Sequence, residues 1–472
     1  MTNSPLAQGD LLAELEIRDL TVDGGALARH EGLVVFLDSG LPGDVVQARV
    51  QSTRKRLVRA TVERTLRRSQ QWQAPWCPHF GECGACSWQN FSPSALLAWK
   101  EEHVRQTLRR LGGGEPVHVE AIAASPAQRE YRNKMAFAFG LDSQKKTILG
   151  LRKNGSHDIV EVTECRLQSR PAMKILEHVR GRIPELGLTA WDDKGRGHPA
   201  EGELRFLVIH SPVYAQEGAQ LIVECICGQS PDAHKGERSR NSIKLRQLGE
   251  ELMGSFGVSG FIHSERVQRS PLAQAEQIIF SLGESVIAER FHHLLLKAPH
   301  DCFMQTNTLA AKLLYARATE CAALTGAEIL WDVYCGVGGL GLYMAEKAKA
   351  VCGFDIQASA IRAAEENSRR LGYDHCRFFA GDLGQSLRKA EVLPDVIILD
   401  PPRAGMDEQV ARILADLPAE RIVYISCDVG TQARDVDRLR KAGWQAACAY
   451  PVDMFPHGPH IENIVLLLRD KA

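Results

Sequence analysis

The chain has 472 residues, a formal net charge of −1, 44% hydrophobic residues and 24% charged residues. This length exceeds what one hydrophobic core supports, so we expect about three domains of a globular protein. No apolar run approaches the roughly 20 residues of a membrane helix, and the N-terminus MTNSPLAQGD lacks the basic and apolar regions of a signal peptide. We therefore expect a cytoplasmic protein with no membrane partner.

Residues 8–70 alternate short apolar runs with turn signals such as Ser39-Gly-Leu-Pro-Gly-Asp. Regular short strands of this kind predict a small β-barrel. Within it, residues 52–70 hold seven basic side chains against a single acid, Glu63. This basic stretch is either a solvated surface or a contact for nucleic acid. Its basic members are Arg54, Lys55, Arg56, Arg59, Arg64, Arg67 and Arg68.

The next segment, residues 71–93, contains three of the thirteen cysteines within ten residues: Cys77, Cys83 and Cys86. We call this segment the cysteine loop. Such a density of thiols points to a metal centre or to disulfides, and disulfides are disfavoured in the cytoplasm. Cys-x2-Cys is also half of a common zinc site, so zinc is one alternative.

Residues 94–118 contain a predicted amphipathic helix that ends at Gly112-Gly-Gly, and we expect it to pack on the C-terminal domain. Its apolar face is formed by Leu96, Leu97, Val104, Leu108 and Leu111. Residues 119–300 mix strand-like runs with charged helical segments. They predict a central α+β domain and carry no chemical motif.

From residue 301 to residue 472, strands of about five residues alternate with helical segments, which is typical of a doubly wound, Rossmann-like α/β sheet. Gly336, Gly338 and Gly341 follow the first strand as G-x-G-x-x-G, and Asp355 ends the second. This motif suits NAD or S-adenosylmethionine, and glycines can also serve only to pack a helix on a strand.

Two further acids at strand ends, Asp382 and Asp400, favour S-adenosylmethionine, because dehydrogenases rarely need an acid after the fourth strand. Asp400 opens the sequence Asp-Pro-Pro-Arg. Methyltransferases that act on amino groups carry an aromatic residue after the prolines, and here that position is Arg403. The sequence therefore argues against an exocyclic amine as the methyl acceptor.

Six motifs in this order resemble the RNA uracil-5-methyltransferase family, and together they span nearly the whole chain. They are Cys77-x5-Cys83-x2-Cys86, Phe303-Met-Gln-Thr-Asn, Tyr334-Cys-Gly-Val-Gly-Gly, Asp400-Pro-Pro-Arg-Ala-Gly, Ser426-Cys427 and Phe455-Pro-His-Gly-Pro-His-Ile-Glu462. Residues 8–70 resemble the TRAM module, an OB-like RNA-binding barrel of the ribosomal members.

The resemblance implies that Cys427 is the nucleophile and Glu462 the base. A thiolate that adds to C6 of uracil makes C5 nucleophilic towards the methyl group, and a carboxylate then removes the C5 proton. By itself, a cysteine after an apolar run is more often an inert buried thiol. Cys335 and Cys352, inside strand-like segments, are interpreted as such core residues.

The resemblance also implies the remaining ligands. For S-adenosylmethionine they are Gln305, Tyr334, Gly339, Asp355, Asp382 and Asp400. For a [4Fe-4S] cluster they are Cys77, Cys83, Cys86 and, from far along the chain, Cys165. The cysteine spacing differs from that of radical S-adenosylmethionine enzymes.

The chain departs from the family pattern at two positions. Asp428-Val429 replaces the usual Asn-Pro after the cysteine, and Gly339 stands where many members have asparagine. An acid close to Cys427 would disfavour its thiolate.

Members with both a TRAM module and a cluster resemble ribosomal enzymes, so the expected function is the formation of 5-methyluridine in 23S rRNA from a flipped uridine. Alternatives are the same reaction on tRNA, cytosine-5 methylation, and a non-catalytic RNA-binding or ribosome assembly protein. We expect a monomer without an obligate protein partner.

Overall fold

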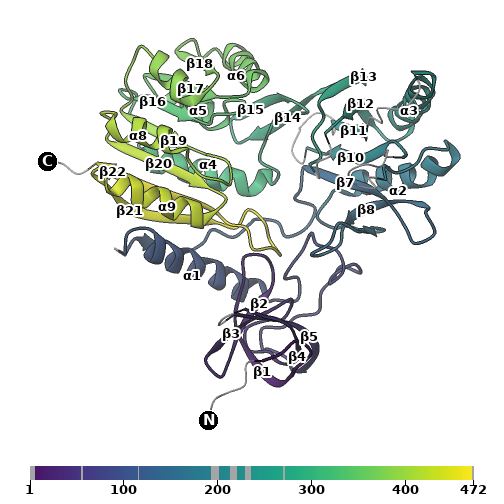
Figure 1. The fold of residues 1–472 in the computed structure, drawn as a ribbon. Helices are drawn as coiled ribbons and strands as arrows, with labels where there is room; N and C mark the ends of the chain where they lie inside the picture. The colour runs from purple at the N-terminus through teal and green to yellow at the C-terminus, as the bar shows by residue number, and fades with distance from the viewer. Residues whose placement is uncertain are drawn as a thin grey trace.

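The computed structural model describes residues 6–54, 57–114, 116–192, 201–212, 220–228, 235–268 and 272–469. Lys55 and Arg56 of the basic stretch lie outside these residues. The chain forms a small N-terminal barrel, a central sheet and a C-terminal α/β sheet, which meet around the loops between them (Figure 1). None of the helices in the described ranges has the length and apolarity to cross a membrane.

The barrel is closed, with the strand order β1-β2-β3-β5-β4. Side chains alternate along it as a half-buried strand requires: Val46, Ala48 and Val50 point into the core, while Arg49 points to solvent. The strands are β1 (Leu11–Leu20), β2 (Ala26–His30), β3 (Leu33–Leu37), β4 (Val45–Arg54) and β5 (Leu57–Arg67). The end of the cysteine loop closes the barrel core, because Trp88 and Phe91 pack into it.

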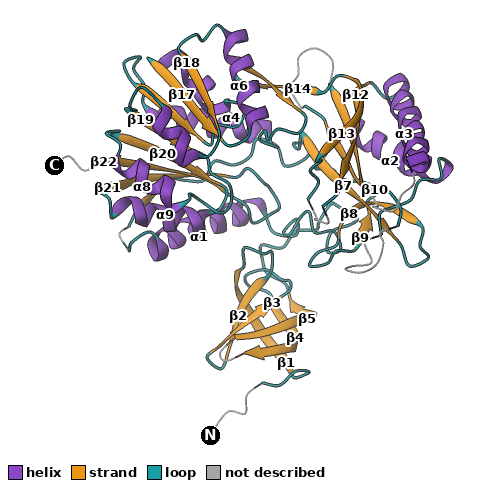
Figure 2. Ribbon diagram, turned by 45° about the horizontal axis from the view of Figure 1, so that its top comes forward, coloured by secondary structure: helices purple, strands orange, loops and turns teal. Residues whose placement is uncertain are grey.

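The central domain is a seven-stranded sheet in the order β13-β12-β11-β10-β7-β8-β9, with two helices packed on one face (Figure 2). Its strands are β7 (Lys134–Leu141), β8 (Thr147–Arg152), β9 (Ile159–Glu161), β10 (Leu204–His210), β11 (Leu221–Gly228), β12 (Val258–Arg266) and β13 (Gln277–Gly283). The helices are α2 (Arg170–Glu185) and α3 (Lys235–Ser255).

The ends of the expected range 119–300 belong to the C-terminal domain rather than to this sheet. β6 (His118–Val119) and Ala123 pair with β21 of the C-terminal sheet. The hairpin of β14 (Val286–Phe291) and β15 (Leu294–Pro299) contributes Phe291, Leu294 and Leu296 to the core beneath that sheet. These short strands carry no local signal of the sheet they join. The expected central domain, residues 119–300, therefore included segments at both of its ends that belong to the C-terminal domain.

The C-terminal domain is an eight-stranded sheet in the order β18-β17-β16-β19-β20-β22-β21-β6, parallel except where β22 meets β20 and β21. Its further strands are β16 (Ile329–Val333), β17 (Ala350–Asp355), β18 (Cys376–Ala380), β19 (Val396–Leu399), β20 (Arg421–Ser426), β21 (Trp444–Val452) and β22 (Glu462–Arg469). Its helices are α4 (Thr308–Ala322), α5 (Gly339–Met344), α6 (Ala358–Leu371), α7 (Leu383–Ser386), α8 (Glu408–Asp416) and α9 (Val429–Arg440). The doubly wound sheet predicted from the sequence is confirmed, with helices on both faces.

The predicted helix after the cysteine loop is α1 (Pro93–Leu111), which lies along α9 and adds Val104 and Leu108 to the core of the C-terminal domain. The expected apolar face was wrong at its end, because Leu111 is 54% exposed. Lys100 is buried in the middle of this face, between Leu96 and Val104.

Candidate functional site

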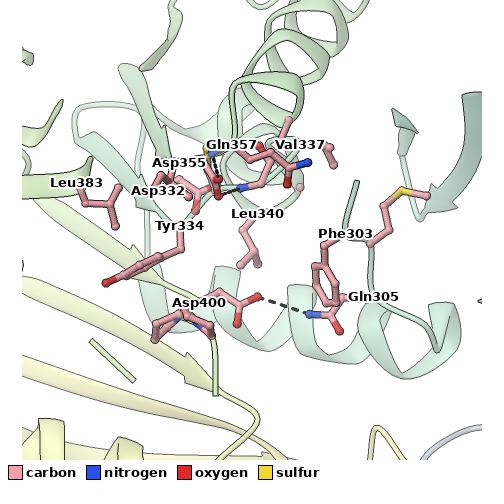
Figure 3. Close-up of a pocket in the computed structure, with 18 of the residues that line it drawn as sticks. Phe303, Gln305, Asp332, Tyr334, Val337, Leu340, Asp355, Gln357, Leu383 and Asp400 are labelled. Atoms are coloured by element: carbon pink, nitrogen blue, oxygen red, sulfur yellow. Dashed lines mark hydrogen bonds between the residues drawn. The ribbon is translucent and has the colours of Figure 1, made fainter. Parts of the chain in front are cut away.

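One cavity of about 650 Å³ lies at the carboxyl ends of the parallel strands, where α/β sheets bind ligands. It is bounded by the glycine-rich turn after β16, the ends of β17, β19 and β20, and the start of β22 (Figure 3). Every cofactor and catalytic residue expected from the sequence lines this cavity: Gln305, Tyr334, Gly339, Asp355, Asp382, Asp400, Cys427 and Glu462.

The turn after β16 is shaped by backbone conformations that glycine adopts readily. Tyr334 and Gly338 have φ angles of 67° and 82°, and Gly338 precedes the first turn of α5. The Gly336 N–H donates to Oδ2 of Asp355 over 2.9 Å. The turn and the end of β17 are thereby tied together, so Asp355 is presented at the cavity wall (Figure 3).

Asp332, which the sequence analysis did not single out, is a further acid of this wall. Its Oδ2 accepts a hydrogen bond of 2.7 Å from the Gly341 N–H, and its Oδ1 has no hydrogen-bond partner among the described residues. Burial raises the pKa of Asp332 to about 7. The sequence signal was a carboxylate inside the apolar strand Ile329–Val333, where an unpaired acid is costly.

Asp400 ends β19 on the opposite wall, and burial raises its pKa to about 7. The amide of Gln305 points at it, with 3.5 Å between Nε2 and Oδ2 (Figure 3). The backbone of Gln305 is itself held by a residue at the start of the central domain, because Nδ2 of Asn133 donates to the Gln305 backbone carbonyl over 2.9 Å. Asp382, also at the cavity, accepts from the Gln385 N–H at the start of α7.

Cys427 is half-buried between the end of β20 and the start of α9. Burial raises the pKa of its thiol to about 11, the charges of Glu462 and Asp400 add to this rise, and Arg403 opposes it by charge and by a hydrogen bond. The Asp428 carboxylate instead accepts from the Thr431 N–H over 2.8 Å as the N-cap of α9. The acids that act on the thiol are therefore those across the cavity.

Glu462 is the first residue of β22, paired across the sheet with Val452, and its carboxylate faces the cavity from a buried position. Burial and the charge of Asp400 raise its pKa well above the usual range for glutamate, and Arg403 opposes this. Oε2 of Glu462 has no hydrogen-bond partner among the described residues. A buried carboxyl group and a half-buried thiol thus share one cavity.

Two residues from the quoted motifs were given no role from the sequence. Arg403 is the cation that acts on both Cys427 and Glu462. Phe303 lies at the cavity and is 65% exposed (Figure 3). An exposed aromatic ring beside a ligand-sized cavity is a stacking surface for a planar ligand. The signal was present in both cases, as an arginine after Pro-Pro and a phenylalanine two residues before a cavity glutamine.

The four cysteines expected to bind metal also come together. Cys77, Cys83 and Cys86 of the cysteine loop and Cys165, which follows β9, line a second, small cavity. His79 fastens the two segments, because its Nε2 accepts from the Thr163 N–H over 3.0 Å. Cys352 is buried in β17 within the core, which confirms its interpretation as a core residue. Cys335 is buried too, but it lies in the turn after β16 and lines the large cavity, so its placement inside a strand was wrong.

The described arginines of the basic stretch lie on or next to β5. Arg59, Arg64, Arg67 and Arg68 are exposed, and the guanidinium of Arg68 lies over the Trp72 ring at 4.6 Å. The single acid of the stretch, Glu63, is paired with Arg49 of β4. The arginines therefore form a net positive patch on the barrel, which we call the barrel patch.

Comparisons with known proteins agree with this architecture. Residues 282–470 match the model of the tRNA (uracil-5-)-methyltransferase family. An uncharacterized RNA methyltransferase of Nitratidesulfovibrio vulgaris is 41% identical over 460 residues, which is 95% of each chain. A second uncharacterized RNA methyltransferase, from Halalkalibacterium halodurans, is 30% identical over 98% of each chain.

Among solved structures, the Pyrococcus abyssi tRNA (uracil-54, C5)-methyltransferase in complex with S-adenosyl-L-homocysteine superposes with a TM-score of 0.73. The match covers 96% of this chain and all of that one at 24% identity, so it shows a shared fold. The family model and the full-length relatives together establish what the motifs predicted: the chain belongs to the RNA uracil-5-methyltransferase family and is an S-adenosylmethionine-dependent RNA methyltransferase.

Proposed function

We propose that the protein methylates C5 of a specific uridine in 23S rRNA, with Cys427 as nucleophile and Glu462 as base. The observation that carries this proposal is that the thiol and the carboxylate face one cavity with Asp400 and Gln305 beside them. Cys427 adds to C6 of the flipped uracil as a thiolate, which turns C5 into a carbon nucleophile. C5 then takes the methyl group from the sulfonium sulfur of S-adenosylmethionine, which is left as S-adenosylhomocysteine. Glu462, as a carboxylate, takes the C5 proton, and the C6–S bond breaks to restore the aromatic uracil and the thiolate.

The cavity suits a cationic methyl donor. Six acidic side chains line its walls, and the Oδ1 atom of the buried Asp332 has no donor among the described residues. S-adenosylmethionine, which supplies the methyl group, carries a positive sulfonium and an ammonium group that such a cavity complements. We propose that Tyr334, Gly339, Asp355 and Asp382 hold its nucleoside side, and that Asp332, Gln305 and Asp400 face its charged side.

The target base would lie between Cys427 and the mouth of the cavity. Phe303 can stack on its ring there, and Arg403 can hold the developing enolate oxygen or the thiolate by charge. When the target base enters the cavity, it loses its base-pairing and stacking partners in the folded RNA. Stacking on the exposed ring of Phe303 offsets part of the free-energy cost of that loss.

We propose that Cys77, Cys83, Cys86 and Cys165 bind a [4Fe-4S] cluster. Burial raises the pKa of Cys86 to about 12 and that of Cys165 to about 11, so these thiols need a cationic centre to ionise. The four cysteines line one small cavity, which either metal centre would need. The choice of an iron–sulfur cluster over a single zinc ion rests on the family resemblance of the cysteine spacing.

The choice of 23S rRNA rests on the barrel and the cysteines. The barrel patch can hold RNA outside the target loop by charge and stacking. Family members that carry both a TRAM-like barrel and an iron–sulfur cluster resemble ribosomal enzymes. We also propose that the enzyme acts in the cytoplasm. We further propose that it is a monomer, and light scattering of the purified protein tests the oligomeric state.

tRNA is the second candidate substrate, because the matched family model names tRNA and the superposed Pyrococcus abyssi enzyme acts on it. The deciding experiment offers radiolabelled S-adenosylmethionine with unmodified 23S rRNA or unmodified tRNA, in separate reactions, and identifies the labelled nucleoside. We expect 5-methyluridine from 23S rRNA. Label only in tRNA would overturn the substrate and leave the chemistry; label in another nucleoside would overturn both.

A further inference from the structure

The loop that delivers Glu462 is held by other parts of the chain. Residues 453–461 join β21 to β22 and end directly before Glu462. Most of this loop is buried although it has no regular structure, so its backbone carbonyls need donors from outside. We call it the base loop.

Lys100 of α1 donates three hydrogen bonds to the base loop, two of them to backbone carbonyls. Its Nζ donates to Oδ1 of Asp453 over 2.6 Å, to the carbonyl of Phe455 over 3.0 Å and to the carbonyl of His460 over 3.2 Å. An ammonium group has three N–H donors, so all of them are spent on the base loop. The side chain of Lys100 is 0% exposed, and one atom thereby ties the start, the middle and the end of the loop together.

Two more segments hold the same loop. The backbone N–H groups of Ser87 and Trp88, at the end of the cysteine loop, donate to the carbonyl of His457 over 2.9 and 3.0 Å. Nδ2 of Asn307, at the start of α4, donates to the carbonyl of Met454 over 2.9 Å. Lys100 also reaches the part next to Glu462, because His460 is two residues away from it; there it holds the backbone carbonyl, while Nη2 of Arg403 lies 3.5 Å from Nε2 of the His460 ring.

The Glu462 carboxylate lacks a comparable support of its own. Its Oε2 has no hydrogen-bond partner among the described residues, so the direction of the carboxylate depends on where the backbone at the start of β22 lies. Cys427, by contrast, follows β20 in the middle of the sheet and receives none of these bonds. The two catalytic groups are thus positioned by different parts of the molecule.

We propose that Lys100 is a positioning residue that sets the base loop so that Glu462 can take the C5 proton. This inference rests on the proposed function, in which Glu462 is the base. A buried lysine is costly to desolvate, and hydrophobic residues would serve a merely structural α1 better. Loss of Lys100 should therefore slow the removal of the proton and the release of Cys427 from C6, while the addition of Cys427 proceeds.

The test uses Lys100→Met and the double variant Lys100→Met/Asp453→Asn, which leaves no unpaired buried carboxylate if the single variant folds poorly. Val104→Ala is the matched control, because Val104 is equally buried one turn further along α1 and touches none of these bonds. Each full-length protein is mixed with radiolabelled S-adenosylmethionine and equal amounts of unmodified 23S rRNA and tRNA. Denaturing gels then follow the covalent protein–RNA adduct and the free methylated RNA over time.

We expect adduct to form in the lysine variants within about threefold of the wild-type rate and to decay at least about tenfold more slowly. Val104→Ala should show no accumulation of adduct, whatever its thermal stability. If methylation in the lysine variants falls without adduct, or in proportion to their melting temperatures as in Val104→Ala, the positioning role is wrong.

The outcome for Glu462→Gln separates this failure from a failure of the proposed function. Adduct in Glu462→Gln but in neither lysine variant would reject the role of Lys100 and keep Glu462 as base. Absence of adduct in Glu462→Gln as well would reject the base assignment on which the inference rests.

Discussion

A Cβ atom added to Gly339 would lie 2.5 Å from the hydroxyl oxygen of Tyr315. Tyr315 is buried on α4, where its ring stacks on Phe291 with 5.1 Å between the ring centroids, so the hydroxyl cannot readily move. Many family members carry asparagine at the position of Gly339. In this chain the tyrosine fills the space of that side chain, and only the backbone of residue 339 faces the cofactor cavity.

Gly339→Ala should therefore weaken the binding of S-adenosylmethionine by about tenfold or more, since either the turn or α4 has to shift. The next atoms of Tyr315 lie 3.5 and 3.7 Å from the added Cβ, which is ordinary contact distance. Gly339→Ala/Tyr315→Phe should then recover most of the affinity. Calorimetric titration of the two variants and of Tyr315→Phe alone gives the comparison, and equal losses in the single and double glycine variants would contradict it.

Cys427→Ala should abolish methyl transfer and leave RNA affinity within about twofold, because the thiolate makes a covalent bond that no neighbouring group replaces. Filter binding of labelled RNA measures the affinity beside the activity. Cys352→Ala is the control, since this thiol is buried in β17, in the core of the sheet domain and away from the cavity wall. Turnover above a few per cent of wild type in Cys427→Ala is incompatible with the nucleophile assignment.

Glu462→Gln should allow addition and methyl transfer but stop the elimination, because an amide cannot accept the C5 proton. A labelled protein–RNA adduct that survives denaturation is the expected observation. Asp428→Asn is the control, because this carboxylate is committed to the N-terminus of α9. Free product at the wild-type rate from Glu462→Gln would remove the carboxylate from the mechanism.

The rate of adduct formation should rise with pH. Cys427 attacks as a thiolate, and below its pKa of about 11 the thiolate fraction grows about tenfold for each pH unit. Arg403 lowers this pKa, so Arg403→Gln should raise it, and the rate should fall several-fold at every pH while the slope stays the same. Arg412→Gln, on the exposed face of α8, serves as control. A rate independent of pH between about 7 and 9 would show that another step limits addition.

Cys165→Ala should remove the brown absorption of protein purified without oxygen and should lower its iron content. Cys225→Ala is matched to it, because Cys225 is buried in the same core but does not line the small cavity. Iron analysis and the visible spectrum of both variants provide the measurement. Full iron content in Cys165→Ala, or zinc in the wild-type protein, would reject the proposed ligand set.

Much of the catalytic half was predictable because its signals are local. The glycine-rich turn and the acid after β17 are each marked by a few adjacent residues. The alternation of short strands with helices is marked by the local period of the hydrophobic residues. The local position of Cys427 after an apolar run favoured an inert thiol, and only the order of the surrounding motifs singled it out. Parallel strands end at one edge, so residues placed there by the sequence necessarily meet.

Other features depended on partners remote in the chain. The hairpin of β14 and β15 looked like part of the central domain, and only packing under the C-terminal sheet assigns it there. Asp332 belongs to no sequence motif, and only the fold places it against Gly341 and the cavity. A side chain's electrostatics are set by what desolvates it, and that is decided after folding.

The sequence by itself determined the family, the chemistry class and the expected cofactor and catalytic residues that line the cavity, because each rests on a short motif with a defined order; Asp332, Arg403 and Phe303 were found there only in the fold. Only the tertiary structure decided that Tyr315 excludes a side chain at Gly339 and that Lys100, hidden in the apolar face of α1, holds the loop before Glu462. Lys100 and its partner Asp453, for example, are 353 residues apart in the chain. Close packing and buried hydrogen bonds relate them, and no local pattern encodes either.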